Sequence, residues 1–508
     1  MDGFIEINTN QMNMPDVGES LFINRSAIAS MQQSSHEAEV SILIQAYNQI
    51  EKTRRCVESV LEHTKDVNYE LILLDNGSKP AITEFFLSVP YSKKKVIRFT
   101  KNLGISYPSS TLNLNELSRF ICFLPCDLIV TSNWLRNLLT CMKSDDRIGM
   151  VNPVSCNTSN LQNIELSYTD YSEMQEKAKR FNRSDAKKWE DRLRLITLGT
   201  LYRKEALMAT GWPIFDAGFF HDFADDDVTF RIRRMGYRTV LAGDTWVCHD
   251  HDLTHGEGKD PAEFQRSLNI GRRNFQEKHF GVDAWEDASN YYISYASHFP
   301  QPKVEGRPQI LGVDSRCGTP ILDIKNWLRK FGIPDAELSA FTQDPKYWLD
   351  LMTICRGPVI CDREEFLIDS FPQDSFNYIV VDRPLNRYHE PAKMLRDLFS
   401  LCKEDGYLIC KLTNAYSFRE YLHLLGQEDV YNPMFSLNIP VARFRSALKQ
   451  WGEIQCELEL GAGLNQESQT LLNSLYPAGL PDGQQAAALK QMQCLEFLFV
   501  VQKKSQQE

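Results

Sequence analysis

Short apolar runs that alternate with helical patterns place the strongest constraint on the fold of this chain. The first run, 40–44, precedes a segment from about Glu51 in which apolar residues recur at helical spacing. A second apolar run follows at 69–74. A strand, a helix and a second strand in this order form a right-handed parallel βαβ unit, so the sequence predicts an α/β fold.

The pattern continues through two further predicted strands, 96–99 and 119–124, and both Asp75 and Asp127 lie just beyond strand ends. Ligands bind at this edge of open α/β sheets. A carboxylate at position 127 is suited to hold a hard cation against phosphate oxygens. The alternative is that Asp127 only begins a turn or caps the helix around Trp134.

Composition and charge limit the class of protein. The 508 residues suffice for about two to four domains, and a net charge of -11 disfavours a nucleic-acid-binding surface, which needs clustered Lys and Arg. No apolar run approaches the ~18 residues of a membrane span. Residues 1–37 form a polar N-terminal extension without the features of a signal peptide. We therefore expect a cytoplasmic protein whose 13 cysteines are reduced.

Beyond the fourth predicted strand the simple alternation ends. Residues 157–195 are polar and charged, and we predict an insertion over the sheet with a helix over residues 173–194. An acidic run at 225–227 begins a helical pattern that extends to Met235. Two short predicted strands between 237 and 248 then lead to His249.

Six motifs in this order resemble those of family 2 glycosyltransferases of the GT-A fold, over about residues 38–298. The motifs are Val40–Asn48, Leu73–Ser78, Asn102–Gly104, Asp127 with Trp134-Leu135, Gly211–Asp216 and Asp225–Tyr237. The resemblance implies an inverting transfer of a sugar from a nucleoside-diphosphate sugar, usually with Mg²⁺ or Mn²⁺. It also favours the metal-binding interpretation of Asp127 over the turn interpretation.

The resemblance aligns Asp127 with the last carboxylate of the family's metal-binding DxD-like motif. A divalent cation, Mn²⁺ or Mg²⁺, would there neutralise charge on the leaving diphosphate. This sequence departs from the motif at Pro125, where the family usually has Asp or Asn, so one carboxylate of the motif remains. His249 is the candidate second metal ligand, and a surface-loop histidine is the equal alternative.

The same resemblance implies that the donor nucleotide lies over the ends of the first strands. Asp75 is expected to hydrogen-bond the base or the ribose, and the ring of Tyr47 either stacks on the base or packs against the protein. The predicted donor-binding residues are Ala46, Tyr47, Asn48, Asp75, Asn102 and Cys126. We expect a nucleoside-diphosphate sugar as the donor, with a UDP-sugar favoured.

Inversion at the sugar requires a general base that takes the proton of the acceptor. The family's Glu-Asp motif aligns with Ala224-Asp225, which implies that Asp225 is the base. The alternative is that the acidic run only caps the helix and complements its dipole. We assign that role to Asp227 and predict Asp226 to be a solvated neighbour. Trp212 either lines the acceptor site or packs in the core.

A second series of strands and helices follows a Pro-rich linker, 299–308, and extends over residues 309–503. It resembles class I S-adenosylmethionine-dependent methyltransferases. Arg316 and Pro320 stand where that family has the glycines of its cofactor turn, and Thr342 replaces an acidic residue that binds the ribose. We therefore expect no S-adenosylmethionine, and a role in packing, acceptor recognition or homo-oligomer formation.

The predicted fold class is thus α/β: a GT-A type nucleotide-binding sheet with flanking helices, followed by a Rossmann-like methyltransferase-type domain. The predicted function is an inverting, metal-dependent glycosyltransferase of hexosyl or N-acetylhexosaminyl type. Its acceptor is expected to be a hydroxyl of a protein or a cell-surface glycan. Two alternatives stand beside it: a bifunctional enzyme that also methylates the glycan, and a non-enzymatic scaffold with two decayed sites.

Overall fold

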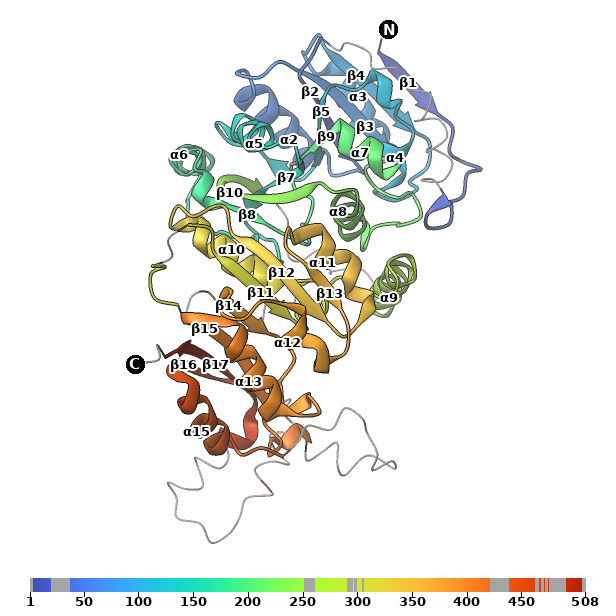
Figure 1. Ribbon diagram of the computed structural model, residues 1–508. Coiled ribbons are helices and arrows are strands. Elements are labelled where there is room, and N and C mark those ends of the chain that lie inside the picture. The colour runs from blue at the N-terminus through green and yellow to red at the C-terminus, as the bar shows by residue number, and fades with distance from the viewer. Residues whose placement is uncertain are drawn as a thin grey trace. The chain divides into compact units, whose positions relative to one another are not determined.

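The computed structural model describes residues 3–19, 37–250, 261–289, 299–303, 306–420, 438–461 and 490–504, with a few single positions between them. The chain divides into two compact units, residues 1–290 and 291–508 (Figure 1). Each unit has its own sheet and its own hydrophobic core. The predicted linker lies within the second unit.

The first unit is built on a ten-stranded sheet with the order β1-β4-β3-β2-β5-β9-β7-β10-β6, and β8 pairs with β10. The first five strands in this order are parallel, β9 is antiparallel to both neighbours, and β7 and β10 are again parallel. The strands are β1 (Phe4–Ile7), β2 (Val40–Ala46), β3 (Tyr69–Asn76), β4 (Lys94–Phe99), β5 (Phe120–Pro125), β6 (Leu128–Ile129), β7 (Ile148–Ser155), β8 (Trp189–Asp191), β9 (Thr200–Arg203) and β10 (Arg238–His249).

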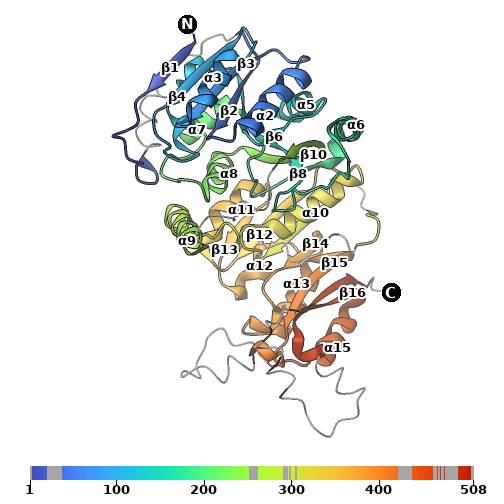
Figure 2. The same cartoon turned by 180° about the vertical axis from the view of Figure 1, so that it is seen from behind.

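Helices cover this sheet, and α2 and α5 lie side by side on one of its faces (Figure 2). Alternate residues of β2, such as Val40, Ile42 and Ile44, share one buried cluster with the apolar faces of α2, α3 and α5. Successive strand residues point to opposite faces, so Leu43 packs on the other side of the sheet. The helices are α2 (Ile50–His63), α3 (Pro80–Ser88), α4 (Tyr107–Ser110), α5 (Trp134–Lys143), α6 (Tyr171–Phe181), α7 (Lys204–Thr210), α8 (Ala224–Arg234) and α9 (Pro261–Lys278).

Part of the predicted N-terminal extension belongs to the sheet. Strand β1 pairs in parallel with β4 at the edge of the sheet (Figure 1). The hydroxyl of Thr9 donates to the carbonyl of Lys101 at 3.0 Å, and the backbone N–H of Gly18 donates to Asp216 at 2.7 Å. The strand has only four residues, which is too short for its pattern to stand out in a polar sequence.

The segment predicted as a helical insertion contains less helix than expected. Helix α6 ends at Phe181, and the chain then forms β8, which is antiparallel to β10. Asp191 of β8 pairs with Arg238 at 2.7 Å, an interaction between residues far apart in sequence that local periodicity does not report. The two short strands predicted between 237 and 248 are one strand, β10, with an irregularity between Ala242 and Trp246.

The second unit contains a seven-stranded sheet with the order β13-β12-β11-β14-β15-β17-β16. The first five strands are parallel, and β17 is antiparallel to both neighbours. The elements are β11 (Gln309–Val313), α10 (Thr319–Lys330), β12 (Glu337–Thr342), α11 (Trp348–Ile354), β13 (Val359–Cys361), α12 (Leu367–Ser370), β14 (Phe376–Val381), α13 (Pro391–Leu401), β15 (Cys402–Thr413), α15 (Val441–Trp451), β16 (Gly452–Gly461) and β17 (Cys494–Lys503). The strand order reverses between β11 and β14, which makes this a doubly wound, Rossmann-like sheet.

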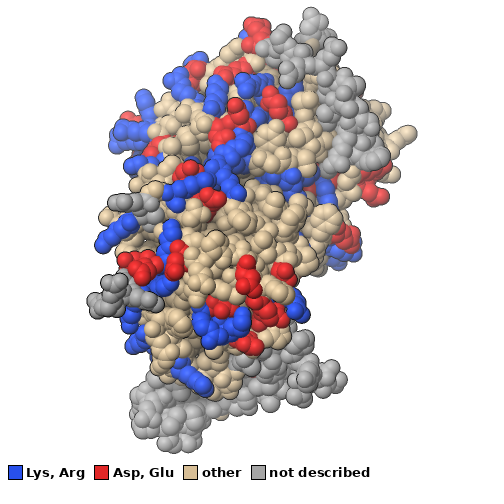
Figure 3. All heavy atoms as spheres, viewed as in Figure 1, with Lys and Arg blue, Asp and Glu red and all other residues tan. Residues whose placement is uncertain are grey.

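Charges of both signs are interspersed on the described part of the face in Figure 3, without a broad basic stripe. Within the described ranges, none of the helices combines the length and apolar character that a membrane-crossing helix requires.

Candidate functional site

The carboxyl ends of β2, β3, β5, β7 and β10 meet at one edge of the first sheet. Strands β5 and β7 both run antiparallel to β9, so they are parallel to each other. The predicted donor-binding and metal-binding residues lie at the ends of β2, β3, β4 and β5 or just beyond them, and His249 ends β10. The topology therefore collects residues from five distant parts of the sequence at the edge where ligands bind in open α/β sheets.

Asp127 and His249 face each other at this edge. Strands β6 and β10 are antiparallel, and His249 is paired with Leu128, the residue after Asp127. The Nε2 atom of His249 lies 3.5 Å from Oδ2 of Asp127, and the two side chains are 13% and 16% exposed. An imidazole nitrogen and a carboxylate oxygen thus converge in a place partly screened from water.

Asn157 fixes the orientation of the His249 ring. The Nδ1 atom of His249 lies 3.1 Å from the carbonyl oxygen of Asn157, and because a carbonyl can only accept, Nδ1 carries the proton. The Nε2 atom of the neutral ring then presents its lone pair toward Asp127. Burial disfavours the charged ring, but the Asp127 carboxylate and the Asn157 carbonyl outweigh it and raise the pKa of His249.

Asp75 is fully buried near the carboxyl end of β3, and its side chain braces the turn that follows. One carboxylate oxygen accepts from the backbone N–H of Ser78 at 2.8 Å, and the other accepts from the hydroxyl of Thr83. Gly77 has φ of 74°, and a Cβ atom there would lie 2.5 Å from the backbone nitrogen of Asn102. Both oxygens of Asp75 therefore hold the protein's own loop, and its contact with the donor stays a prediction.

The loop after β2 leaves Tyr47 accessible. Ala46 is buried within the sheet, whereas the side chain of Tyr47 is 47% exposed. Asn48 and Gln49 both have positive φ, at 57° and 51°, and the Asn48 side chain accepts from the backbone of Lys79 at 3.1 Å. This loop is braced in a sparsely populated backbone conformation and presents an aromatic ring.

Asn102 and Cys126, the remaining predicted donor-binding residues, are held by neighbouring loops. The Asn102 side-chain oxygen accepts from Gly104 N–H at 2.8 Å and from the Asn76 amide at 3.1 Å. Cys126 is buried beside Thr53, and burial together with the nearby Asp127 charge raises the pKa of its thiol to about 11. Because the Cys126 thiol stays neutral, it does not repel the negative charge of an anionic ligand.

Asp225 lies in the first turn of α8 with intermediate exposure. Burial of its carboxylate and the negative charge of Asp226 raise its pKa to about 6, against the opposing effects of Arg194 and His221. The group is therefore ionised at neutral pH but binds a proton more readily than an ordinary aspartate. A pKa near the working pH suits a general base.

The structure corrects the predicted roles of the two neighbouring carboxylates. Asp226 is buried, not solvated, and forms an ion pair with Arg194. The N-cap of α8 is Phe223, and both carboxylate oxygens of Asp227 are engaged by other side chains. Asp227 is fully buried among Lys278, Arg231 and His279, at 2.7, 2.8 and 2.9 Å, and the cations hold its pKa well below the ordinary value despite burial. Its role is to join α8 to α9.

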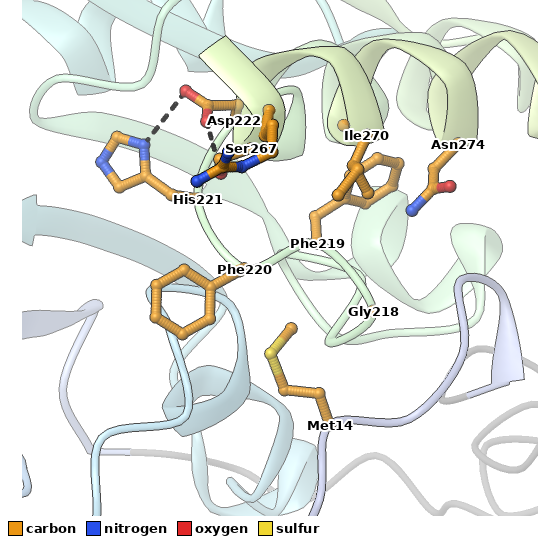
Figure 4. A pocket seen from close by; sticks show the side chains of 11 residues that line it. Met14, Gly218, Phe219, Phe220, His221, Asp222, Ser267, Ile270 and Asn274 are labelled. Atoms are coloured by element: carbon orange, nitrogen blue, oxygen red, sulfur yellow. Dashed lines mark hydrogen bonds and ion pairs between the residues drawn. The ribbon is translucent and has the colours of Figure 1, made fainter. Parts of the chain in front are cut away.

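A pocket of about 430 Å³ lies between residues 218–222 and α9, with Met14 at its side (Figure 4). Phe219, Phe220 and Ile270 make its lining largely apolar. Its polar side carries Asp222, which accepts from the hydroxyl of Ser267 at 3.3 Å. The lining residues 218–222 lie just before α8 in the sequence. Trp212, in contrast, is buried, and its indole donates to a backbone carbonyl at 3.3 Å.

The described residues contain no group of three or more His, Cys, Asp and Glu side chains arranged to hold a metal ion. Asp127 and His249 alone would therefore need further ligands to hold a cation. His251 and His255, the next histidines in the sequence, lie outside the described residues. One carboxylate oxygen and one imidazole nitrogen fit a divalent cation whose other ligands come from diphosphate oxygens and water.

Three further residues shape this edge without any local sequence signal. Arg55 of α2 pairs with Asp250 at 2.6 Å, which places a positive charge beside His249. Asn157 orients the His249 ring from the start of a segment that reads as a surface insertion. Arg194 neutralises Asp226 from the end of the same segment. Only the fold brings these side chains to the site.

The corresponding edge of the second unit is occupied by internal contacts. Asp314 accepts from the backbone and side-chain amides of Gln343 at 2.8 and 2.9 Å and from the Tyr388 hydroxyl at 2.8 Å. Arg316 has positive φ, at 54°, and its guanidinium lies 3.7 Å from Asp382. Asp314 and Arg316, which stand in the predicted cofactor turn, are thus held by contacts within the second unit.

Residues 41–210 match the family model described as Glycosyl transferase family 2. An uncharacterized glycosyltransferase of Rickettsia felis is 30% identical over 152 residues, which are 29% of this chain and 21% of that protein. One of Rickettsia bellii is 32% identical over 119 residues, 23% of this chain and 17% of that protein. The matched part therefore spans about a fifth of the length of each of these relatives.

Two solved structures illustrate the similarity of this chain to known proteins. A mannosyltransferase of Pyrobaculum calidifontis, in complex with GDP-Man and Mn²⁺, covers 56% of this chain and 85% of its own, at 15% identity and a TM-score of 0.33. A chain from the complex of the Haloferax volcanii Trm112 methyltransferase activator covers 49% and 98%, at 12% identity and a TM-score of 0.29. The predicted α/β fold class is confirmed, and residues 41–210 are similar to family 2 glycosyltransferases.

Proposed function

We propose that the protein is a metal-dependent, inverting glycosyltransferase that moves a sugar from a nucleoside-diphosphate sugar to a hydroxyl of a protein or a cell-surface glycan. The donor is expected to be a UDP-sugar with a hexosyl or N-acetylhexosaminyl group. The observation that carries the proposal is the meeting of Asp127 and His249, 122 positions apart in the numbering, at the ligand-binding edge of the sheet. The family match independently supports sugar transfer.

Asp127 and His249 would hold a Mn²⁺ or Mg²⁺ ion in this mechanism. When bound, the ion supplies positive charge that offsets the charge developing on the leaving diphosphate. Asn157 keeps the Nε2 lone pair of His249 directed at this position. Arg55, paired with Asp250, adds a second positive charge from α2 and so compensates in part for the carboxylates around it.

Asp225 would act as the general base. Its carboxylate takes the proton of the acceptor hydroxyl while that oxygen attacks the anomeric carbon of the sugar. The buried pair of Asp226 with Arg194 keeps a negative charge next to Asp225, and this charge helps to raise its pKa to about 6. The base is therefore ionised at neutral pH, and its basicity exceeds that of a solvent-exposed aspartate.

The apolar pocket before α8 would receive part of the acceptor. Phe220 is 51% exposed, and so is Ile270 on the opposite wall. Exposed apolar residues that line a concavity are typical of binding sites. The second unit would contribute no methyl transfer, because Asp314 and Arg316 are committed to internal contacts. It is expected to serve in packing, acceptor recognition or oligomer formation.

A screen of nucleoside-diphosphate sugars with Mn²⁺, followed by nucleotide release, tests this function. We expect release from one donor class, its loss in excess chelator, and its loss in Asp127→Asn. The matched control is Asp146→Asn, because the Asp146 side chain is 94% exposed and lies away from the sheet edge. Full activity in excess chelator would remove the metal from the mechanism. No release from any donor would contradict the proposed function.

A further inference from the structure

Two cysteines lie next to His249: Cys248 precedes it in the sequence, and Cys156 contacts its backbone carbonyl. Cys156 follows β7, and Cys248 is the penultimate residue of β10, a parallel neighbour of β7. The sulfur atoms are 3.7 Å apart, and the residues are 3% and 4% exposed. All 13 cysteines of the chain are reduced, so this is a dithiol and not a disulfide.

The strand register brings the two backbones to a distance that a disulfide can bridge. Val247 is paired with Ser155, so the next residues, Cys248 and Cys156, continue in register. Neighbouring strands lie about 4.8 Å apart, and disulfides span Cα distances of about 4.4 to 6.8 Å. Since the sulfurs must approach from 3.7 Å to about 2.05 Å, we expect side-chain rotation to supply most of the movement.

Each cysteine is adjacent in the sequence to a residue of the histidine site: Cys156 to Asn157, which orients the ring, and Cys248 to His249 itself. The Cys156 thiol donates to the carbonyl of His249 at 3.6 Å, and Cys248 directly precedes that residue. Asn157, which fixes the imidazole through its own carbonyl, directly follows Cys156. Turning the two thiols toward each other removes the Cys156 hydrogen bond and acts on the backbone at both points that position the ring.

We propose that Cys156 and Cys248 form a reversible disulfide and that this modification weakens cation binding at Asp127 and His249. The oxidant class is a hydroperoxide, represented by hydrogen peroxide. Dithiols in reducing compartments that oxidise at all are typically redox-sensing or catalytic. The coupling to cation binding rests on the proposed function of His249, whereas the disulfide itself does not.

The chemistry balances with one peroxide molecule. One cysteine first loses its proton, and its thiolate attacks the O–O bond of the peroxide. The sulfur becomes a sulfenic acid, and the released hydroxide takes up the proton that the thiol lost and leaves as water. The second thiol attacks the sulfenic sulfur, so that the S–S bond forms, the S–O bond breaks and a second water leaves. The two thiols lose two electrons in total, and the peroxide oxygens gain them.

Peptide mapping of the full-length protein tests the modification. The protein is titrated with hydrogen peroxide until the exposed Cys361 is oxidised, which shows that the oxidant is active, and is then alkylated and digested. We expect a linked peptide that contains Cys156 and Cys248 and disappears on treatment with dithiothreitol. The link should persist in Cys361→Ser and be absent in Cys156→Ser. Separate alkylated peptides for both cysteines in the wild type would overturn the proposal.

Mn²⁺ titration by calorimetry tests the coupling. We expect the oxidised wild type to bind Mn²⁺ at least about tenfold more weakly than the reduced protein, the size of effect that residues orienting a metal ligand typically have. Cys156→Ser should show the same affinity with and without peroxide. Equal affinity of the two wild-type states, including no binding in either, would overturn the coupling. Nucleotide release by the reduced protein decides the proposed function separately.

Discussion

Replacement of Asp225 by asparagine is expected to remove activity and to stabilise the protein. Loss of a general base lowers kcat by about 10²- to 10⁴-fold, while donor affinity stays nearly unchanged. The stabilising effect follows from the carboxylate, whose pKa rises from 3.8 to about 6 on folding. A group that binds protons more tightly when folded makes its ionised form unfavourable in the folded state.

The magnitude of the expected stabilisation follows from the shift in the pKa of Asp225. About two pKa units correspond to about 3 kcal/mol, and partial exposure to solvent reduces this to about 1 to 2 kcal/mol. Asparagine also loses the favourable interaction of the carboxylate with the helix N-terminus, about 0.3 to 1 kcal/mol. The net expectation at pH 7 is stabilisation by about 1 kcal/mol, or an increase of about 2 to 4 °C in the melting temperature of a unit this large.

The pH dependence of the stability gain in Asp225→Asn tests whether the raised pKa of Asp225 causes it. Above pH 6 Asp225 is ionised in both folded and unfolded protein, so the gain in Asp225→Asn is complete. Below the unfolded pKa of 3.8 it is protonated in both states, so the gain disappears. The activity of the wild type should fall about tenfold for each pH unit below 6. Thermal melts at pH 7.5 and 4 and a pH profile of kcat/KM measure both effects.

Asp226→Asn is the matched control, and its effect on stability has the opposite sign. The substitution leaves the partly buried Arg194 without its carboxylate, which costs about 3 kcal/mol. Loss of the Asp226 charge also lowers the pKa of Asp225, so any remaining activity persists to lower pH. Full turnover in Asp225→Asn, or equal destabilisation by both substitutions, would refute the assignment of Asp225 as the base.

Four further outcomes test other parts of the structure. His249→Ala should weaken Mn²⁺ binding at least about tenfold by calorimetry, while His389→Ala in the second unit leaves it unchanged. Asp227→Asn should destabilise the protein by about 3 kcal/mol in denaturant, because it leaves buried cations unpaired, and the difference should narrow as the pH falls below 3.8. Phe220→Ala should raise the KM for the acceptor and leave donor hydrolysis unchanged. Calorimetry of the full-length protein should detect no S-adenosylmethionine binding.

The sequence predicts the ends of β2, β3, β4 and β5 to within about two residues, because each of these strands is largely an apolar run that stops near a polar residue. Asp75 and Asp127 therefore fall where the pattern places them. The sequence does not, however, predict which residues surround a carboxylate. Asp226 and Asp227 are adjacent and identical in type, yet one pairs with Arg194 and the other with Lys278. Those partners come from distant segments, and no local pattern distinguishes the two aspartates.

The same limit applies to the pairing of Asp127 with His249. The chain order indicates a histidine near the diphosphate, but the contact depends on β6, a two-residue strand that turns back along β10. Such a short strand has no periodicity to detect. The structure brings the two side chains together, and their binding of a cation remains a prediction.

The two units of the chain use the same kind of sheet edge in opposite ways. In the second unit, Asp382 pairs with Lys411 at 2.8 Å, and both are almost fully buried. Asp314 is likewise occupied by two residues of its own domain. In the first unit, Asp127 and His249 meet at 3.5 Å with their side chains still partly exposed. Polar groups that already satisfy one another within a buried domain have little to gain from a ligand, and the proposed chemistry is therefore assigned to the first unit.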